Sequence, residues 1–168
     1  MYNTLMKNSL VVYILFLLLL PFSLYSSEPK QKQLLTPAKT LEVLQGLNGS
    51  AITFGTGKKV IHTFIDPYCE LSQRYLAFVF KKKKRMFKKY TLKFYLYELK
   101  GKKSSEVIAS ILSSDLKDIA LKTVMINYED LEIEDDGDAE DAIDLISEAA
   151  EKIGVYKRPY IIINGKVK

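Results

Sequence analysis

The residues of this chain with the clearest chemical potential lie in one short segment, Asp66 to Ser72 (DPYCELS). Its central residue, Cys69, is the only cysteine among 168 residues, and an apolar run precedes the segment. A thiol becomes a nucleophile when it loses its proton, and the free N–H groups at a helix N-terminus favour the thiolate. One isolated thiol can attack a disulfide bond but cannot close one within its own chain. The segment therefore predicts redox chemistry that passes through a single sulfur atom.

A buried strand before Cys69 and an amphipathic helix after it are expected to position the thiol. The run from Val60 to Ile65 is apolar and rich in β-branched residues, which predicts a central strand, and Pro67 ends it. From Glu70 onward the apolar residues recur at helical spacing, which predicts a helix that continues to about Phe87. Cys69 is therefore expected in the first turn of a helix that follows a rigid strand.

The other segments alternate between strand and helix patterns. Further strands are expected at residues 51–54 and 91–99, and a last strand at 155–166 is expected to run into an Asn-Gly hairpin turn. Helices are expected at residues 36–45, 104–112, 116–128 and 141–153, with a solvated acidic loop at 129–141. This order predicts an α/β protein with a central mixed sheet, flanking helices and a helical insert.

The N-terminal segment predicts export. Lys7 precedes an apolar run that begins at Leu10, and Pro21 and small residues follow it, which is the pattern of a secretory signal. The apolar run is shorter than the ~20 residues that a membrane-spanning helix needs. We expect cleavage after Ser26, and the alternative is an uncleaved leader that anchors the protein in the inner membrane. The expected divisions are a signal peptide at residues 1–26, a tether at 27–36 and one domain at 37–168.

Export changes the meaning of the lone cysteine. An odd thiol in an oxidising compartment is either reactive or paired with another chain, and a buried, inert cysteine is the alternative. The net charge of +5 is modest and its charges occur in blocks, so nucleic acid is not expected as a partner. The basic block from Lys81 to Lys89 is expected to be a solvated helix end, with a membrane-headgroup or acidic-partner role as the alternative. His62, the only histidine, is expected to be a sheet residue and not a catalytic base.

Two segments read together resemble the exported DsbC/DsbG type of thioredoxin-fold disulfide oxidoreductases and isomerases. Residues 60–72 are similar to the family's active-site strand and its Asp-Pro-x-Cys-x-x-Cys motif. Residues 154–166 are similar to its Gly-Val…Thr-Pro segment, the strand that follows and the Asn-Gly turn. The resemblance covers residues 51–166 and implies a thioredoxin-like fold in which a cis-proline, Pro159, lies beside Cys69. It implies protein thiols or disulfides as substrates and no metal or cofactor.

This chain departs from the family pattern at its second cysteine, before its cis-proline and at its end. Ser72 stands where the family has its second cysteine, so a mixed disulfide formed by Cys69 would have to be cleared by glutathione or another protein thiol. Arg158 replaces the usual Thr before the proline, where its charge could favour the thiolate or present a cation to an anionic ligand. The sequence ends at Lys168, so the family's last strand and closing helix are expected to be missing or shortened.

Two hypotheses about function follow. The first is a periplasmic thiol-disulfide oxidoreductase or isomerase of monothiol type. The second is a non-catalytic thioredoxin-fold protein that binds or chaperones a partner and carries a vestigial thiol. For the first, the expected catalytic residues are Cys69, Ser72 and Pro159, and the expected substrate-binding residues are Tyr68 and Arg158.

Overall fold

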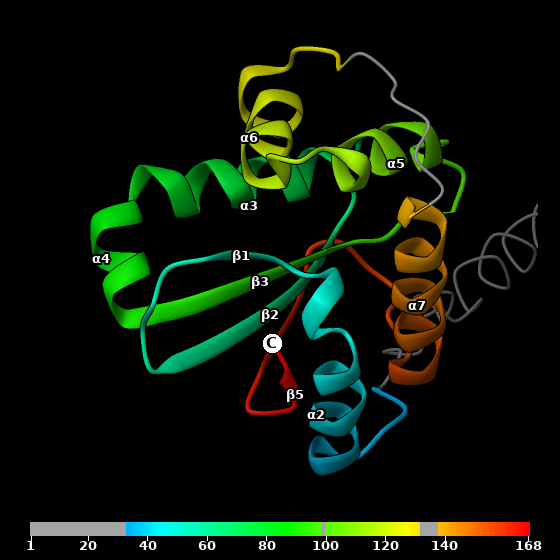
Figure 1. Ribbon diagram of the computed structural model, residues 1–168. Coiled ribbons are helices and arrows are strands. Elements are labelled where there is room, and N and C mark those ends of the chain that lie inside the picture. The colour runs from blue at the N-terminus through cyan, green and yellow to red at the C-terminus, as the bar shows by residue number, and fades with distance from the viewer. Residues whose placement is uncertain (1–32, 99, 132–137) are drawn as a thin grey trace, which may run out of the picture. The chain divides into compact units, whose positions relative to one another are not determined.

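A mixed five-stranded β-sheet forms the centre of the computed structural model, which describes residues 33–98, 100–131 and 138–168. Its strands are β1 (Ile52–Phe54), β2 (Lys59–Ile65), β3 (Tyr90–Leu96), β4 (Tyr160–Ile163) and β5 (Lys166–Val167). They lie in the order β1-β3-β2-β4-β5 (Figure 1). The central strands β2 and β3 run parallel, and every other neighbouring pair is antiparallel. The predicted α/β architecture with a mixed sheet is confirmed.

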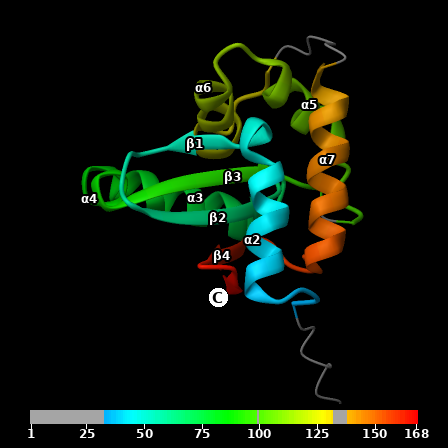
Figure 2. The same cartoon turned by 60° about the horizontal axis from the view of Figure 1, so that its bottom comes forward.

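Helices cover both faces of this sheet. Figures 1 and 2 show α2 on one face, with α7 beside it, and α3 on the other. The predicted helical insert, α5 and α6, follows β3 in the chain and packs against α7 and the edge strand β1. The helices are α2 (Pro37–Gly46), the 3₁₀ turn η1 (Asn48–Ser50), α3 (Glu70–Lys81), α4 (Lys83–Lys89), α5 (Ser105–Ser113), α6 (Lys117–Lys122), the π-helical turn η2 (Thr123–Asn127) and α7 (Asp138–Ile153).

The register of β2 and β3 decides which side chains face which helices. Thr63 is aligned with Phe94, and the ring of Tyr75 on α3 lies 6.3 Å from that of Phe94, so both residues face α3. Because successive side chains of a strand point to opposite faces, His62 lies on the face that α2 covers. The core is fully buried on both sides of the sheet and includes Phe64, Ile65, Leu76, Leu92, Phe94, Leu96, Tyr160 and Ile162.

The helix that was expected to run without interruption from Glu70 to about Phe87 is two helices, α3 and α4, which meet at Lys82. This residue has φ −107° and ψ 17°, and its N–H donates to the carbonyls of both Phe78 and Val79. The change of direction brings the Phe87 ring 5.8 Å from that of Phe54 on β1. Burial of an aromatic ring against the sheet therefore outweighs continuation of a helix through five consecutive cations, whose like charges repel one another.

Other boundaries differ by a few residues. The strand expected at 91–99 is β3, which ends at Leu96. In place of the last expected strand, at 155–166, the structure has two shorter strands, β4 and β5. The expected acidic loop at 129–141 ends earlier, because α7 begins at Asp138; residues 132–137 lie outside the described residues. So do the expected signal peptide and most of the expected tether.

The predicted Asn-Gly turn joins β4 to β5. Asn164 and Gly165 have φ values of 52° and 73°, the left-handed conformations that a two-residue hairpin turn requires. A Cβ atom at Gly165 would lie 2.1 Å from the Pro37 carbonyl oxygen, so only glycine fits where the turn meets α2. The last strand, β5, comprises two residues, in agreement with the expectation of a shortened final strand.

Candidate functional site

Cys69 lies between the end of β2 and the start of α3, where it is the N-cap residue of the helix. Its carbonyl accepts a hydrogen bond from the Gln73 N–H at 3.0 Å, and its own N–H donates to the Asp66 carbonyl at 3.0 Å. The residue is 7 % exposed, and its Sγ donates to the carbonyl oxygen of Arg158 at 3.8 Å. The expected position of Cys69 at a helix start is therefore confirmed, with the thiol directed inward.

The loop that faces Cys69 comes from the C-terminal part of the chain. Its Arg158–Pro159 peptide bond is cis, as the family resemblance implies, and β4 begins directly after it. Because β4 is antiparallel to β2, with Tyr160 aligned to Phe64, the start of β4 lies at the same edge of the sheet as the end of β2. This pairing brings together two segments that are 89 positions apart in the sequence.

A buried polar network holds the loop from Asp66 to Cys69 (the Cys69 loop). The carboxylate of Asp66 accepts hydrogen bonds from the Tyr68 N–H at 2.8 Å and from the Ser104 hydroxyl at 3.1 Å. The Asp66 N–H donates in turn to Ser72 Oγ at 3.3 Å. Asp66, Ser72 and Ser104 are all 0 % exposed. Ser72 therefore fixes the backbone of the loop through its hydroxyl oxygen.

Arg158 is also buried, at 4 % exposure. Its guanidinium donates to the backbone carbonyls of Tyr97, Glu98 and Lys157 at 2.9–3.1 Å and lies 4.1 Å from the centre of the Tyr97 ring. Burial lowers the pKa of Arg158, and neighbouring groups that include Asp66 oppose this shift. One sequence-based expectation was that Arg158 presents a cation to an anionic ligand, but these three bonds direct the charge into the protein. The group that faces the thiol is the Arg158 carbonyl.

Exposed apolar side chains lie next to the buried thiol. Tyr68 is 49 % and Leu71 59 % exposed, and they flank Cys69 in the chain, while Pro159 is half-buried on the facing loop. Large exposed apolar groups beside a recessed thiol are suited to contact with a polypeptide.

Solved structures share this arrangement of sheet and helices. The catalytic domain of ScsC from Proteus mirabilis matches with a TM-score of 0.60 at 14 % identity, over 77 % of this chain and 88 % of that one. The fold is thioredoxin-like. DsbG from Helicobacter pylori matches with a TM-score of 0.56 at 16 % identity, over 75 % of this chain and 61 % of that one. A periplasmic thioredoxin-like protein from Salmonella enterica serovar Typhimurium matches with a TM-score of 0.54 at 13 % identity, over 75 % and 86 % of the two chains. No family model and no curated protein sequence matches the chain.

The thioredoxin-like fold brings together the site residues that the sequence analysis singled out. Cys69 and Arg158 are in contact, Pro159 follows Arg158, and Ser72 and Tyr68 lie on either side of the thiol in the chain. Two supporting residues, Asp66 and Ser104, were not predicted from the sequence. Asp66 carried a usable signal, because an Asp followed by Pro favours a turn closed by its own carboxylate. Ser104 lies 38 positions away from Asp66, and no local pattern indicates their contact.

His62 is a buried sheet residue, as expected. It is 8 % exposed, and its Nδ1 lies 2.9 Å from the Tyr95 hydroxyl. Burial, with a smaller contribution from the charge of Lys93, lowers its pKa to about 4. With Lys93, His62 lines a hollow of about 880 Å³ on the α2 face. None of the residues that line this hollow belongs to the Cys69 loop.

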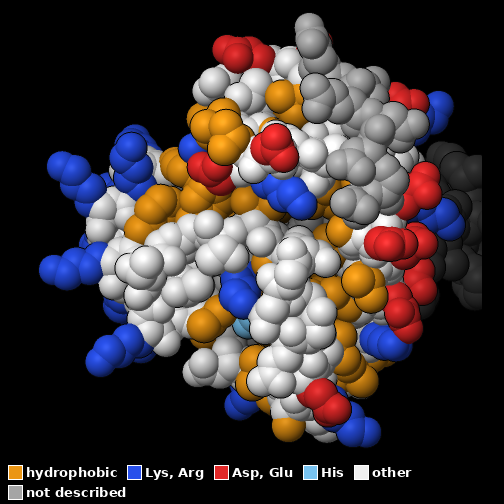
Figure 3. All heavy atoms as spheres, viewed as in Figure 1, with side chains coloured by type: hydrophobic (Ala, Val, Ile, Leu, Met, Phe, Trp, Pro, Cys, Tyr) orange, Lys and Arg blue, Asp and Glu red, His pale blue; other side chains and the backbone are white. Residues whose placement is uncertain are grey.

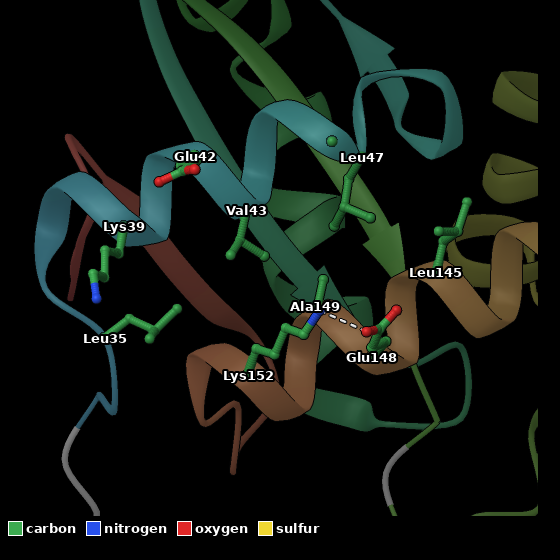
Figure 4. Close-up of a pocket in the computed structure, with 10 residues that line it drawn as sticks. Leu35, Lys39, Glu42, Val43, Leu47, Leu145, Glu148, Ala149 and Lys152 are labelled. Atoms are coloured by element: carbon green, nitrogen blue, oxygen red, sulfur yellow. Dashed lines mark ion pairs between the residues drawn. The ribbon is translucent and has the colours of Figure 1, made fainter.

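A second hollow, of about 440 Å³, lies between α2 and α7. Figure 4 shows apolar side chains on its walls and an ion pair between Lys152 and Glu148 on α7. It does not reach Cys69. The residues that line it are Leu35, Lys39, Glu42, Val43, Gly46, Leu47, Leu145, Glu148, Ala149 and Lys152.

None of the helices among the described residues has the length and apolar character needed to cross a bilayer. Within the same ranges, no group of three or more His, Cys, Asp or Glu side chains is arranged to hold a metal ion.

Proposed function

We propose that this protein is an exported thiol-disulfide oxidoreductase or isomerase that acts through the single thiol of Cys69. One observation carries the proposal: the Sγ atom lies at the start of α3, 3.8 Å from the backbone carbonyl of Arg158 in the cis-proline loop. A helix N-terminus favours a thiolate. The neighbouring loop offers backbone groups and the apolar Pro159 to a polypeptide that approaches the sulfur. The fold shared with DsbG and with the catalytic domain of ScsC is consistent with this chemistry.

The reaction would be thiol–disulfide exchange. The Cys69 thiolate attacks one sulfur of a substrate disulfide, a bond forms between these two sulfurs, and the other substrate sulfur leaves as a thiolate. If a different thiolate of the same substrate attacks the substrate sulfur of the mixed disulfide, Cys69 leaves as a thiolate and the substrate has rearranged its disulfide with no net oxidation. Attack by the thiolate that left first only restores the original disulfide. If an external thiolate, from glutathione or a protein, attacks the Cys69 sulfur instead, the second substrate sulfur leaves as a thiolate and Cys69 is left in a mixed disulfide with the external thiol. A second external thiolate then releases Cys69, so that two external thiols are joined in a disulfide as one substrate disulfide is reduced. The isomerase route needs no further reactant.

The proposed roles of the other residues follow from their places. Pro159 and the Arg158 backbone line the approach to the sulfur, and Tyr68 adds exposed apolar surface next to it. Ser72 cannot resolve a mixed disulfide, because a hydroxyl is not a thiol. Its hydroxyl instead holds the Asp66 N–H, which keeps the loop in position. The mixed disulfide would therefore persist until an external thiolate attacks it.

The expected partners and location rest on the leader and on this chemistry. Protein thiols or disulfides are the proposed substrates, with glutathione or a redox protein as the proposed electron partner. We place the protein in the periplasm with its leader cleaved after Ser26, or anchored to the inner membrane if the leader is retained. No cofactor is required by the exchange reaction.

Trapping of mixed disulfides tests this proposal. Incubated with a peptide disulfide, the protein is expected to form a covalent adduct at Cys69 faster than the same chain unfolded in urea, and Cys69→Ala should form none. Ser72→Cys supplies a second thiol, so its adduct should decay without added thiol. An adduct that forms no faster in the folded protein than in the unfolded chain would contradict the proposal.

One observation favours the second candidate, a binding or chaperone protein without turnover: the thiol is 7 % exposed and has no second cysteine. The same variant separates the two functions. If Cys69→Ala retains full suppression of aggregation of a reduced, unfolded substrate while the native protein forms no adduct, the non-catalytic function is correct.

A further inference from the structure

The end of the molecule remote from Cys69 carries a dense basic surface. We define the α4 basic surface by seven cations at the end of α3, at the junction and on α4, all of them exposed: Lys81, Lys82, Lys83, Lys84, Arg85, Lys88 and Lys89. No Asp or Glu occurs between Glu70 and Glu98. Among the described residues, none of the seven forms an ion pair. Within the described part of the chain, no carboxylate is therefore paired with these charges.

The fold adds further cations to this end. Gly57, in the β1–β2 turn, lies so close to α4 that a Cβ atom on it would be 2.0 Å from the Lys89 carbonyl carbon. Lys58 and Lys59 follow directly and are exposed. Figure 3 shows basic side chains projecting beyond the α4 end, while acidic side chains gather on the opposite side of that view, where α7 lies in Figure 1. On this face, basic side chains thus predominate at the α4 end.

We propose that the α4 basic surface binds anionic phospholipid headgroups. Six of its seven cations are Lys, a flexible point charge that suits a diffuse negative surface, whereas the fixed geometry of protein carboxylates favours Arg. Lys is also depleted at protein–protein interfaces, which rely on buried apolar or aromatic anchors. Two aromatic rings of this region, Phe80 and Phe87, pack against Phe54 and are not available as anchors. Phe78 on α3 is 52 % exposed and is the one large exposed apolar side chain that adjoins the cations in the described part of the chain. Clusters of four to eight cations are sufficient for attraction to an acidic membrane surface.

The geometry gives this binding an orientation. α3 has 12 residues and is therefore about 18 Å long. Cys69 lies at its N-terminus, and the α4 basic surface begins at its C-terminus. Contact between that surface and a bilayer would hold the thiol away from the lipid. This inference rests on the charge distribution alone and does not depend on the proposed thiol chemistry.

Vesicle co-sedimentation tests the inference. The chain from residue 27 onward avoids any contribution of the leader and contains the whole compact unit Lys32–Lys168 with its own core. It is expected to bind phosphatidylcholine vesicles that contain about 30 % phosphatidylglycerol and not to bind vesicles of pure phosphatidylcholine. About 0.5 M NaCl is expected to release the bound protein. Binding that is equal with and without the anionic lipid would overturn the inference.

Two matched variants locate the binding surface. The first replaces Lys82, Lys83, Lys84 and Arg85 by Gln, and the second replaces Lys100, Lys102, Lys166 and Lys168 by Gln. Both lower the net charge by the same amount at exposed positions. At roughly fivefold in affinity per cation near the surface, the loss of four cations is expected to weaken binding by the first variant on the order of 600-fold. The second variant is expected to bind only a few-fold more weakly.

Circular dichroism verifies that both variants are folded. Equal losses in the two variants would show a general charge effect and overturn the assignment to α4. Soluble polyglutamate distinguishes an acidic protein as the partner. If it binds as tightly as the anionic vesicles and its binding depends on the same four cations, the surface recognises acidic polypeptide and the lipid proposal is wrong.

Discussion

The two ends of helix α3 differ in the burial and hydrogen bonding of their side chains. At its start, the side chains around Cys69 are buried and hydrogen-bonded: Asp66 accepts two hydrogen bonds, and Arg158 gives three to backbone carbonyls. At its end, seven cations stand in solvent with no ion pair among the described residues. The first end is held in one geometry, and the second is free to adapt. Chemistry at a single atom needs the former, and attraction to a diffuse charge is compatible with the latter.

This contrast predicts that stability is concentrated at the thiol end. A buried polar group that loses its partner leaves other groups unsatisfied, which is costly. An exposed cation that is removed leaves nothing unsatisfied and relieves repulsion from its neighbours. The following substitutions test the contrast, from the largest expected effect to the smallest.

Asp66→Ala should have the largest effect. It leaves the Tyr68 N–H and the Ser104 hydroxyl without their acceptor in a buried site, and we expect a loss of about 3 kcal/mol in the free energy of unfolding, measured in urea. Asp66→Asn is the matched control, because its amide oxygen still accepts from Tyr68. If the two variants are equally stable, the carboxylate network does not support the loop.

His62 should make stability depend on pH. The folded pKa is about 4, against an ordinary value of 6.5, so the unfolded chain takes up a proton first as the pH falls. Above pH 6.5, His62 therefore has little effect on the free energy of unfolding. Between pH 6.5 and pH 4, its preferential protonation in the unfolded chain lowers that free energy. From these pKa values, the His62 contribution makes the free energy of unfolding about 2 kcal/mol lower at pH 5 than at pH 7. In His62→Gln this part of the pH dependence should disappear, and an unchanged profile would mean that other groups cause it.

Ser72→Ala should cost about 1 kcal/mol, because the buried Asp66 N–H loses its acceptor at 3.3 Å. Ser113→Ala is the control. Among the described residues, Ser113 Oγ is a buried hydroxyl with no hydrogen-bond partner, so its removal should be neutral or slightly stabilising. Chemical denaturation of both variants measures the difference, and equal losses would remove the assigned role of Ser72 in the loop.

Lys83→Gln with Lys84→Gln should have the smallest effect. Both side chains are exposed, so we expect the free energy of unfolding to change by less than about 0.5 kcal/mol. Any change should be stabilising at low salt and vanish as salt screens the repulsion between neighbouring cations. A clear loss of stability would show that α4 has a structural role that its exposed side chains do not reveal.

The sequence predicted the parts of this protein that depend on local patterns. The strand at Val60–Ile65 and the helix start after Cys69 follow from periodicity and from Pro67, and the turn at Asn164 follows from its dipeptide. The break at Lys82 was missed because it depends on a ring of β1, Phe54, that lies far away in the chain. The inward direction of the Arg158 charge was missed for a similar reason, since two of its three acceptors lie 60 or more positions away.

The recessed position of the thiol also limits chemical damage. A cysteine that is oxidised to a sulfenic acid is normally rescued when a second thiol condenses with it, and without that rescue further oxidation is irreversible. This chain has no second thiol of its own. Susceptibility to peroxide follows exposure, and Cys69 is only 7 % exposed. Burial against the Arg158 carbonyl therefore limits the access of oxidants to Cys69, whereas a dithiol protein reverses the first oxidation step with its second cysteine.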